Sequence, residues 1–201
     1  MSEQPSRSAS IERRTGETDI KLTIELDGIG SVNADTGVPF LDHMLDALGR
    51  HGRMNLLVDA SGDASMDPHH TVEDTGIALG QALREALGDR KGIERYGHAY
   101  APLDEALARV VIDISGRPYF EMRADMPEAV IGIDFAASLV EEFWRSVSMN
   151  AGLTVHIDLL RARNSHHAAE AIFKAAAVAL RNAVRQSGPA NAIPSTKGML
   201  A

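Results

Sequence analysis

Two copies of the pattern His-His-x-x-Glu are the residues of this chain best suited to chemistry. They are His69-His70-Thr71-Val72-Glu73 and His166-His167-Ala168-Ala169-Glu170, and each opens an Ala/Leu-rich stretch with helical periodicity. Residues four apart lie one above the other on a helix face, so the first histidine and the glutamate of each copy can bind one ion. Adjacent histidines point about 100° apart, which suits two neighbouring metals better than one. The pattern predicts a paired-metal site at the junction of a duplicated structure.

Composition restricts the chemistry further. The chain has 201 residues, enough for one large domain or two subdomains. It has no cysteine, which excludes thiolate zinc sites and cysteine nucleophiles. Its formal net charge of −8 argues against general nucleic-acid binding, which needs a basic face. An anionic substrate must therefore be bound by a few well-placed cations.

The sequence also predicts where the protein resides. No run of about 18 apolar residues occurs, so a membrane span is not expected. Residues 1–10 are polar and serine-rich without an apolar core, which is typical of a mobile tail and not of a signal peptide. We therefore expect a cytoplasmic protein.

The chain is organised as two similar halves, each with the order strand, strand, helix, strand, helix. Gly52 and Gly152 follow the first helix of each half, and both are expected helix C-caps. We expect an α+β fold in which each half forms a sheet with two helices on one face and the halves pack together. The expected segments are a tail over 1–10, halves over 11–92 and 93–193 linked through 88–97, and a substrate-binding tail over 194–201. The expected strands are 11–15, 20–26, 55–60, 106–115, 119–123 and 153–160, and the expected helices are 39–50, 69–87, 134–149 and 166–185.

The helix before each motif offers one more candidate ligand, His43 in the first half and Glu142 in the second. A lone histidine on an apolar helix is more often a core residue than a ligand, but the repeat favours a ligand role for His43. His51 and His98 lack such support and are expected at the surface or in helix caps. His156 lies in an alternating strand, where we expect a structural or supporting role.

Lys174 lies one helical turn beyond Glu170, and Glu170 lies one turn beyond His166. A cation there is useful if the substrate carries an anion near the metals. The alternative is a solvated surface lysine.

Imidazole and carboxylate ligands without sulfur suit Mn²⁺, Fe²⁺, Co²⁺, Ni²⁺ or Zn²⁺. About four protein ligands for each ion leave open coordination positions, which indicates catalysis more than structure. The residue order is not His-Glu-x-x-His, so the zinc-protease interpretation fails.

Five ordered motifs together resemble one enzyme family. They are residues 37–45 (GVPFLDHML), 67–74 (DPHHTVED), 113–119 (DISGRPY), 164–171 (NSHHAAEA) and 194–198 (PSTKG). They resemble the imidazoleglycerol-phosphate dehydratases of histidine biosynthesis, and the resemblance extends from Arg13 to Leu200. It implies a lyase with two Mn²⁺ ions per active site and a duplicated α+β fold. It also implies a shell of 24 subunits with active sites between subunits. The chain carries no phosphatase domain and so resembles the monofunctional form.

The resemblance implies a role for each matching residue. Glu17 matches a glutamate that acts in acid/base catalysis. Many family members have histidine where this chain has Glu142, and a carboxylate can serve the same ions through oxygen. The implied metal ligands are His43, His69, His70, Glu73, Glu142, His166, His167 and Glu170. The implied phosphate-binding residues are Arg95, Arg117, Lys174, Ser195 and Lys197.

The chemistry of this reaction explains why such groups are needed. The C2 proton of imidazoleglycerol phosphate is not acidic, and its C3 hydroxide is a poor leaving group. An imidazolate held between two metals would let ring electrons expel the hydroxyl and give a diazafulvene-like intermediate. Glu17 is the candidate base for the C2 proton, although its spacing alone suggests an exposed strand carboxylate. Arg117 offers a planar fork for phosphate, and we expect the 194–198 tail to order over that phosphate.

Two other functions use the same residues. A dinuclear phosphoesterase would hydrolyse phosphate esters and release inorganic phosphate. A metal-storage protein would bind ions without turnover and would not need Arg95, Arg117 and Lys197. Neither explains all five motifs.

Overall fold

The computed structural model describes residues 7–62, 67–189, 192–196, 198 and 200. The first half contains β1 (Ser8–Arg14), β2 (Thr18–Glu25), β3 (Val32–Asp35), α1 (Pro39–Gly52), β4 (Asn55–Gly62) and α2 (His69–Leu87). The second half contains β5 (Tyr96–Leu103), β6 (Ala106–Asp113), β7 (Tyr119–Arg123), β8 (Val130–Ile131), β9 (Phe135–Ala136), α3 (Leu139–Ala151), β10 (Thr154–Arg161) and α4 (Ser165–Val184). Apart from the β8–β9 hairpin, the two halves repeat one order of elements.

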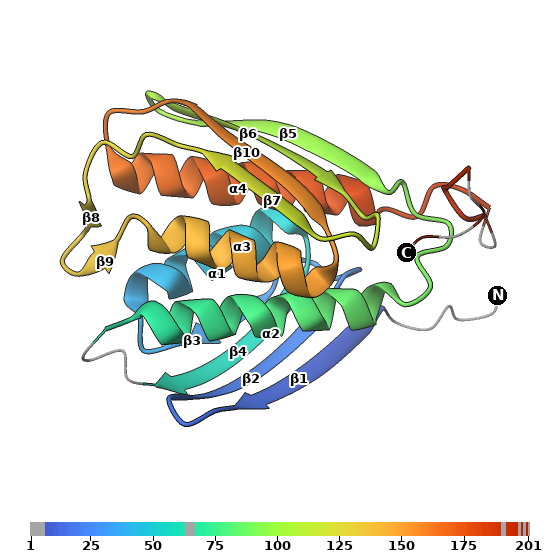
Figure 1. Cartoon of the computed structure of the whole chain (residues 1–201), viewed down its shortest axis with the longest axis horizontal. Coiled ribbons are helices and arrows are strands. Elements are labelled where there is room, and N and C mark those ends of the chain that lie inside the picture. Colours follow the sequence, from blue (N-terminus) through green and yellow to red (C-terminus); the bar gives the residue numbers. More distant parts are fainter. Residues whose placement is uncertain (1–6, 63–66, 190–191, 197, 199, 201) are drawn as a thin grey trace.

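In this part of the chain, four helices lie between two four-stranded sheets (Figure 1). The strand orders correspond, β1-β2-β4-β3 in the first sheet and β5-β6-β10-β7 in the second. In each sheet the last two strands of that order are parallel and the other neighbours are antiparallel. The α+β class and the duplicated halves, each a sheet with two helices on one face, are confirmed.

Strand β2 shows why the sheets have one buried face. Ile20, Leu22 and Ile24 alternate with more exposed residues along the strand, so the apolar side chains all point toward the helices. The inner faces of both sheets and the helices between them form one continuous hydrophobic core.

The helices approach each other closely where the two halves meet. Gly76 and Gly80 lie one turn apart on α2, and a Cβ at either would come within 2.8 Å of a backbone oxygen of α3, at Phe143 or Val147. Glycine therefore lets α2 and α3 pack backbone to backbone at this seam.

The predicted strand pattern was wrong in both halves, because each half contains one strand that the sequence did not predict. Strand β3 has only four residues. Strand β5 carries Gly97, Ala99 and Ala101 on its inner face, and a Cβ at Gly97 would come within 1.9 Å of the Ala179 carbonyl oxygen of α4. These small inward residues let α4 pack closely, but they hide the alternation of apolar side chains that identifies a strand.

Other boundaries also needed correction. Helix α3 begins at Leu139, five residues later than expected, because Phe135 and Ala136 belong to the β8–β9 hairpin. Strand β1 begins at Ser8, so strand structure extends into the stretch expected to be a tail. None of the helices in the described ranges combines the length and apolar character needed to cross a lipid bilayer.

The helix C-caps follow the prediction in one half only. Gly152 caps α3 in the left-handed conformation at φ 68°. In α1 the left-handed residue is Arg53 at φ 55°, and Gly52 is the last helical residue. Arg53 therefore takes the capping position that was expected for Gly52.

Candidate metal centre and substrate site

The second His-His-x-x-Glu motif lies at the start of α4, at the same end of the molecule as the start of α2 (Figure 1). Asn164 precedes the helix, and its side chain accepts a hydrogen bond from the backbone N–H of His167 at 3.0 Å. The helical spacing brings His166 Nε2 within 3.3 Å of Glu170 Oε2. The first turn of α4 therefore presents an imidazole and a carboxylate together, as the spacing predicts.

His43 joins this pair from α1, which packs beside α4. Its Nε2 lies 3.4 Å from Glu170 Oε2, and its side chain is 47% exposed, so it is not a core histidine. One ligand atom from each of His43, His166 and Glu170 lies within 4.8 Å of the other two. Two ligands about 2.1 Å from an ion and at right angles to each other lie about 3 Å apart. Two imidazoles and a carboxylate at these distances fit a divalent transition metal.

Glu170 connects this cluster to a cation. Its other oxygen, Oε1, forms an ion pair with Lys174 Nζ at 2.6 Å. Burial alone would raise the pKa of the Glu170 carboxyl, but the Lys174 hydrogen bond and the contact with His43 lower it. The Lys174 side chain is only 20% exposed, so the solvated-surface interpretation of this lysine was wrong.

At the start of α2, the first motif lies farther from its neighbouring carboxylates. His69 Nε2 lies 3.9 Å from Glu73 Oε2, and His70 Nε2 lies 3.7 Å from Glu17 Oε2. Both separations exceed hydrogen-bond length. Glu17 belongs to the turn between β1 and β2, and its side chain is 58% exposed. The structure thus places the candidate base beside one of the candidate ligands.

A buried carboxylate, Asp74, fixes this turn against α2. Its side chain is 9% exposed and forms an ion pair with Arg13 at 2.8 Å. It also accepts a hydrogen bond from the hydroxyl of Thr18, the residue after Glu17. Asp74 therefore holds the backbone next to Glu17 in place while leaving the Glu17 side chain exposed.

The sequence reading missed Glu105, which contacts a motif histidine in the second half. Glu105 lies in the turn between β5 and β6, and its Oε2 accepts a hydrogen bond from His167 Nδ1 at 2.9 Å. This bond lowers the pKa of the Glu105 carboxyl to about 2 and raises the pKa of His167. The signal was available, because Glu105 directly precedes the second strand of its half as Glu17 does. The correspondence between Glu105 and Glu17 was not recognised, because strand β5 was not predicted.

Two of the predicted phosphate-binding residues, Arg95 and Ser195, lie close together near the C-terminal end of the chain. Arg95 forms a two-pronged ion pair with Asp113 at 2.7 and 3.1 Å and donates to the Pro194 carbonyl at 2.8 Å. This brings Arg95 next to Ser195. Arg117 is exposed before β7, and its backbone oxygen accepts a bond from Thr154. Lys197 lies outside the described residues.

Arg95 lies far from the cluster of His43, His166 and Glu170 within one chain. The backbone N–H of Arg95 donates to the carbonyl of Ala183, at the end of α4. The segment of α4 from Glu170 to Ala183 is roughly 20 Å long at about 1.5 Å per residue. Lys174 is thus beside the cluster, whereas Arg95 and Ser195 are at the other end of the helix.

Glu142 is not brought into this ligand cluster. It forms an ion pair with Arg145 at 3.3 Å on α3. His98 is exposed on the outer face of the second sheet, as expected for a surface histidine. His156 is also exposed there, and its ring lies 5.6 Å from that of Tyr119.

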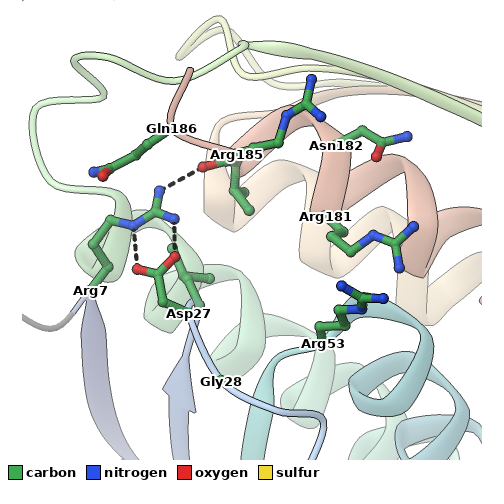
Figure 2. Close-up of a pocket in the computed structure, with 11 residues that line it drawn as sticks. Arg7, Asp27, Gly28, Arg53, Arg181, Asn182, Arg185 and Gln186 are labelled. Atoms are coloured by element: carbon green, nitrogen blue, oxygen red, sulfur yellow. Dashed lines mark hydrogen bonds and ion pairs between the residues drawn. The ribbon is translucent and has the colours of Figure 1, made fainter. Parts of the chain in front are cut away.

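A basic pocket of about 550 Å³ lies where α1 and α4 end (Figure 2). No predicted site residue lines it. Arg7 there is paired with Asp27, and Arg181 donates to a carbonyl at the end of α1. Arg53 is the C-cap of α1, where the helix dipole favours a cation. Helix-end electrostatics therefore explain Arg53 and Arg181, and Asp27 balances the charge of Arg7.

Known proteins resemble this chain in sequence and in fold. A family model described as imidazoleglycerol-phosphate dehydratase matches residues 36–180. The chain is 55% identical over 195 residues to the imidazoleglycerol-phosphate dehydratase of Hydrogenovibrio crunogenus, covering 96% of this chain and 100% of the relative. It is 56% identical over 195 residues to that of Thiobacillus denitrificans, with the same coverage.

Solved structures agree. The crystal structure of the Staphylococcus aureus imidazoleglycerol-phosphate dehydratase matches with a TM-score of 0.81 and 43% identity, covering 90% of this chain and 99% of that one. The Pyrococcus furiosus enzyme matches with a TM-score of 0.81 and 36% identity, covering 94% and 100%. The matches place the chain among the hydro-lyases, enzymes that remove water from their substrates. More narrowly, the chain belongs to the imidazoleglycerol-phosphate dehydratase family, which confirms the resemblance of the five motifs.

Proposed function

We propose that the chain converts D-erythro-imidazoleglycerol phosphate to imidazole acetol phosphate in histidine biosynthesis, in the cytoplasm. Family membership supports the reaction. The observation that carries the proposal is the cluster of His43, His166 and Glu170 beside Lys174, which combines metal ligands with a cation for an anionic substrate.

The proposed cofactor is Mn²⁺, two ions for each active site. The cluster has the nitrogen and oxygen donors that such ions accept. When bound, the ions would supply the Lewis acidity that holds the substrate ring as an imidazolate and allows loss of the C3 hydroxyl through a diazafulvene-like intermediate. The proposed ligands are His43, His69, His70, Glu73, Glu142, His166, His167 and Glu170.

Glu17 is the proposed base that removes the C2 proton. Its carboxylate is exposed, so it can reach a bound substrate, and its backbone is fixed through Thr18 and Asp74. Its distance of 3.7 Å from Nε2 of the proposed ligand His70 supports a role beside the bound substrate ring. A positioned carboxylate next to the reacting carbon is what general-base catalysis requires.

The phosphate-binding residues imply that the active site is shared between subunits. Lys174 is beside the cluster, but Arg95 and Ser195 are roughly 20 Å away along α4. A three-carbon glycerol chain between the imidazole ring and the phosphate is much shorter than this. We therefore propose a homo-oligomer, a shell of 24 subunits, in which Arg95, Arg117, Ser195 and Lys197 of one subunit serve the metal centre of another.

The proposed role of Glu142 as a metal ligand can be tested separately. Because it is not in the cluster of its own chain, we propose that it acts as a ligand in a site completed by a neighbouring subunit. Glu142→Ala should weaken metal binding or assembly, measured as metal content and molecular mass. Unaltered metal content and mass would remove Glu142 from the ligand set.

The decisive experiment is the release of keto product from imidazoleglycerol phosphate by chelator-stripped protein, with and without added Mn²⁺. We expect product only after Mn²⁺ is added. No product from folded, metal-loaded protein would contradict the proposal. Release of inorganic phosphate instead would identify a phosphoesterase, and metal binding without turnover would identify a storage protein.

A further inference from the structure

Glu105 bonds both to His167 and to the segment before α4. One carboxylate oxygen accepts a hydrogen bond from His167 Nδ1 at 2.9 Å, and the other accepts the backbone N–H of Arg163 at 3.2 Å. The side chains of Glu105 and His167 are 20% and 33% exposed. Glu105 therefore ties the imidazole to the segment that leads into α4.

This contact determines which ring nitrogen carries the proton. A carboxylate can only accept hydrogen bonds, so His167 Nδ1 must be the donor. In the neutral imidazole the lone pair then lies on Nε2, the nitrogen available to a metal. The carboxylate contacts of His43, His69 and His166 are made through Nε2 instead, at 3.4, 3.9 and 3.3 Å. His167 therefore contacts its carboxylate through Nδ1, whereas those three histidines make these contacts through Nε2.

The repeat shows that this is a specialised contact. Glu17 and Glu105 each directly precede the second strand of their half, and each faces the second histidine of its motif. Glu17 is 3.7 Å from Nε2 and 58% exposed, whereas Glu105 is 2.9 Å from Nδ1 and 20% exposed. Equivalent positions therefore approach opposite nitrogens of the imidazole.

We propose that Glu105 is a positioning residue, which fixes the tautomer and orientation of His167 so that Nε2 can bind a metal. This inference rests on the proposed function, because it takes His167 as a ligand. Carboxylates that accept the second N–H of a metal-binding histidine typically change metal affinity by about 10–100-fold.

The test compares Glu105→Ala with Glu128→Ala in the full-length protein. Glu128 is the matched control, because its carboxylate caps the backbone of Ser165 at the same end of α4 and does not bond an imidazole. We expect Mn²⁺ affinity, measured by competition with a chelator, to fall about 10–100-fold in Glu105→Ala and to stay unchanged in Glu128→Ala. Glu105→Gln, which keeps an acceptor, should restore part of the loss.

A second readout needs no metal. Nitrogen-15 NMR of the metal-free protein, recorded above the pKa of His167 where the ring is neutral, should show its proton on Nδ1, and Glu105→Ala should shift it toward Nε2. Unchanged affinity in Glu105→Ala, an equal loss in Glu128→Ala, or the Nε2-protonated tautomer of the neutral His167 ring in the unsubstituted protein would overturn the inference. If the unsubstituted protein binds no Mn²⁺ and forms no product, the proposed function itself fails. If it does both and Glu105→Ala is unaffected, only the role of Glu105 fails.

Discussion

The two halves of the molecule place the same residue types at the same positions but bond them differently. In the first half the glutamate before the second strand lies 3.7 Å from its histidine and is mostly exposed. In the second half the corresponding pair is bonded at 2.9 Å and mostly covered. The glutamate of the first motif lies 3.9 Å from one imidazole, whereas Glu170 of the second lies within 3.4 Å of two imidazoles and also binds Lys174.

The anchoring of the two motif helices differs as well. Helix α2 is fixed by the buried Asp74, and the corresponding residue of α4 is the buried Ala171. The start of α4 is capped by Asn164, which accepts the backbone N–H of His167, whereas at the start of α2 Asp67 accepts the backbone N–H of His69 at 2.9 Å. The two halves therefore differ in how their carboxylates are bonded. In the second half, Glu105 and Glu170 are bonded to His167 and Lys174, whereas in the first half Asp74 fixes the backbone beside Glu17 and the Glu17 carboxylate is exposed.

Among the substitutions that test this comparison, Glu170→Gln should have the largest effect, a loss of metal affinity. It replaces the carboxylate that faces His43, His166 and Lys174, so metal affinity should fall by more than the roughly 100-fold that a lost supporting bond can cost. Turnover should disappear with the metal. Elemental analysis would measure the metal content, with Glu73→Gln as the corresponding change in the first motif. A greater loss in Glu73→Gln would reverse the comparison.

Glu17→Gln should lower turnover by roughly 10²–10⁴-fold, because a positioned base is lost. The metal content should remain intact, since Glu17 is proposed to act on substrate. The measurement is kcat with the metal content of the same sample. Loss of metal would move Glu17 into the ligand set and make the two halves more alike than we infer.

Asp74→Ala should lower the free energy of unfolding by about 3 kcal/mol, because it leaves the Arg13 guanidinium and the Thr18 hydroxyl without their acceptor. Urea denaturation would measure it. The control is Asp19→Ala, whose carboxylate is 3.7 Å from the exposed Arg14 and should contribute less than about 1 kcal/mol. Equal effects of the two changes would show that Asp74 is not the anchor of the first half.

Asn164→Ala should have the smallest effect, about 1 kcal/mol, through loss of the α4 cap. Asn164→Asp keeps an acceptor and adds a charge that the helix N-terminus favours, so it should retain stability. Thermal unfolding of both variants would test this. If alanine and aspartate behave alike, the Asn164 side chain does not stabilise α4 as a cap.

Local patterns in the sequence predicted much of the fold. The bounds of α2 and β7 agree with the structure because α2 has strong helical periodicity and β7 is bounded by turn residues. Strand β5 was missed because its inner face is made of glycine and alanine, and that omission hid Glu105. Motif spacing predicted the His166, Glu170 and Lys174 face of α4, since these residues share one helix.

Contacts between elements could not be predicted from local patterns in the sequence. His43 and Glu170 are 127 residues apart, and only the packing of α1 against α4 brings them together. The wide separation of Arg95 from the metal-ligand cluster also follows from the tertiary fold, because it depends on where β5 begins relative to α4.

That separation has a consequence for mixed assemblies. If each catalytic centre joins the metal-ligand end of one subunit to the Arg95 end of another, a copy defective at one end can still supply the other. Two inactive proteins, one lacking Glu170 and one lacking Arg95, would then regain activity when assembled together, and two defective genes in one cell would complement each other.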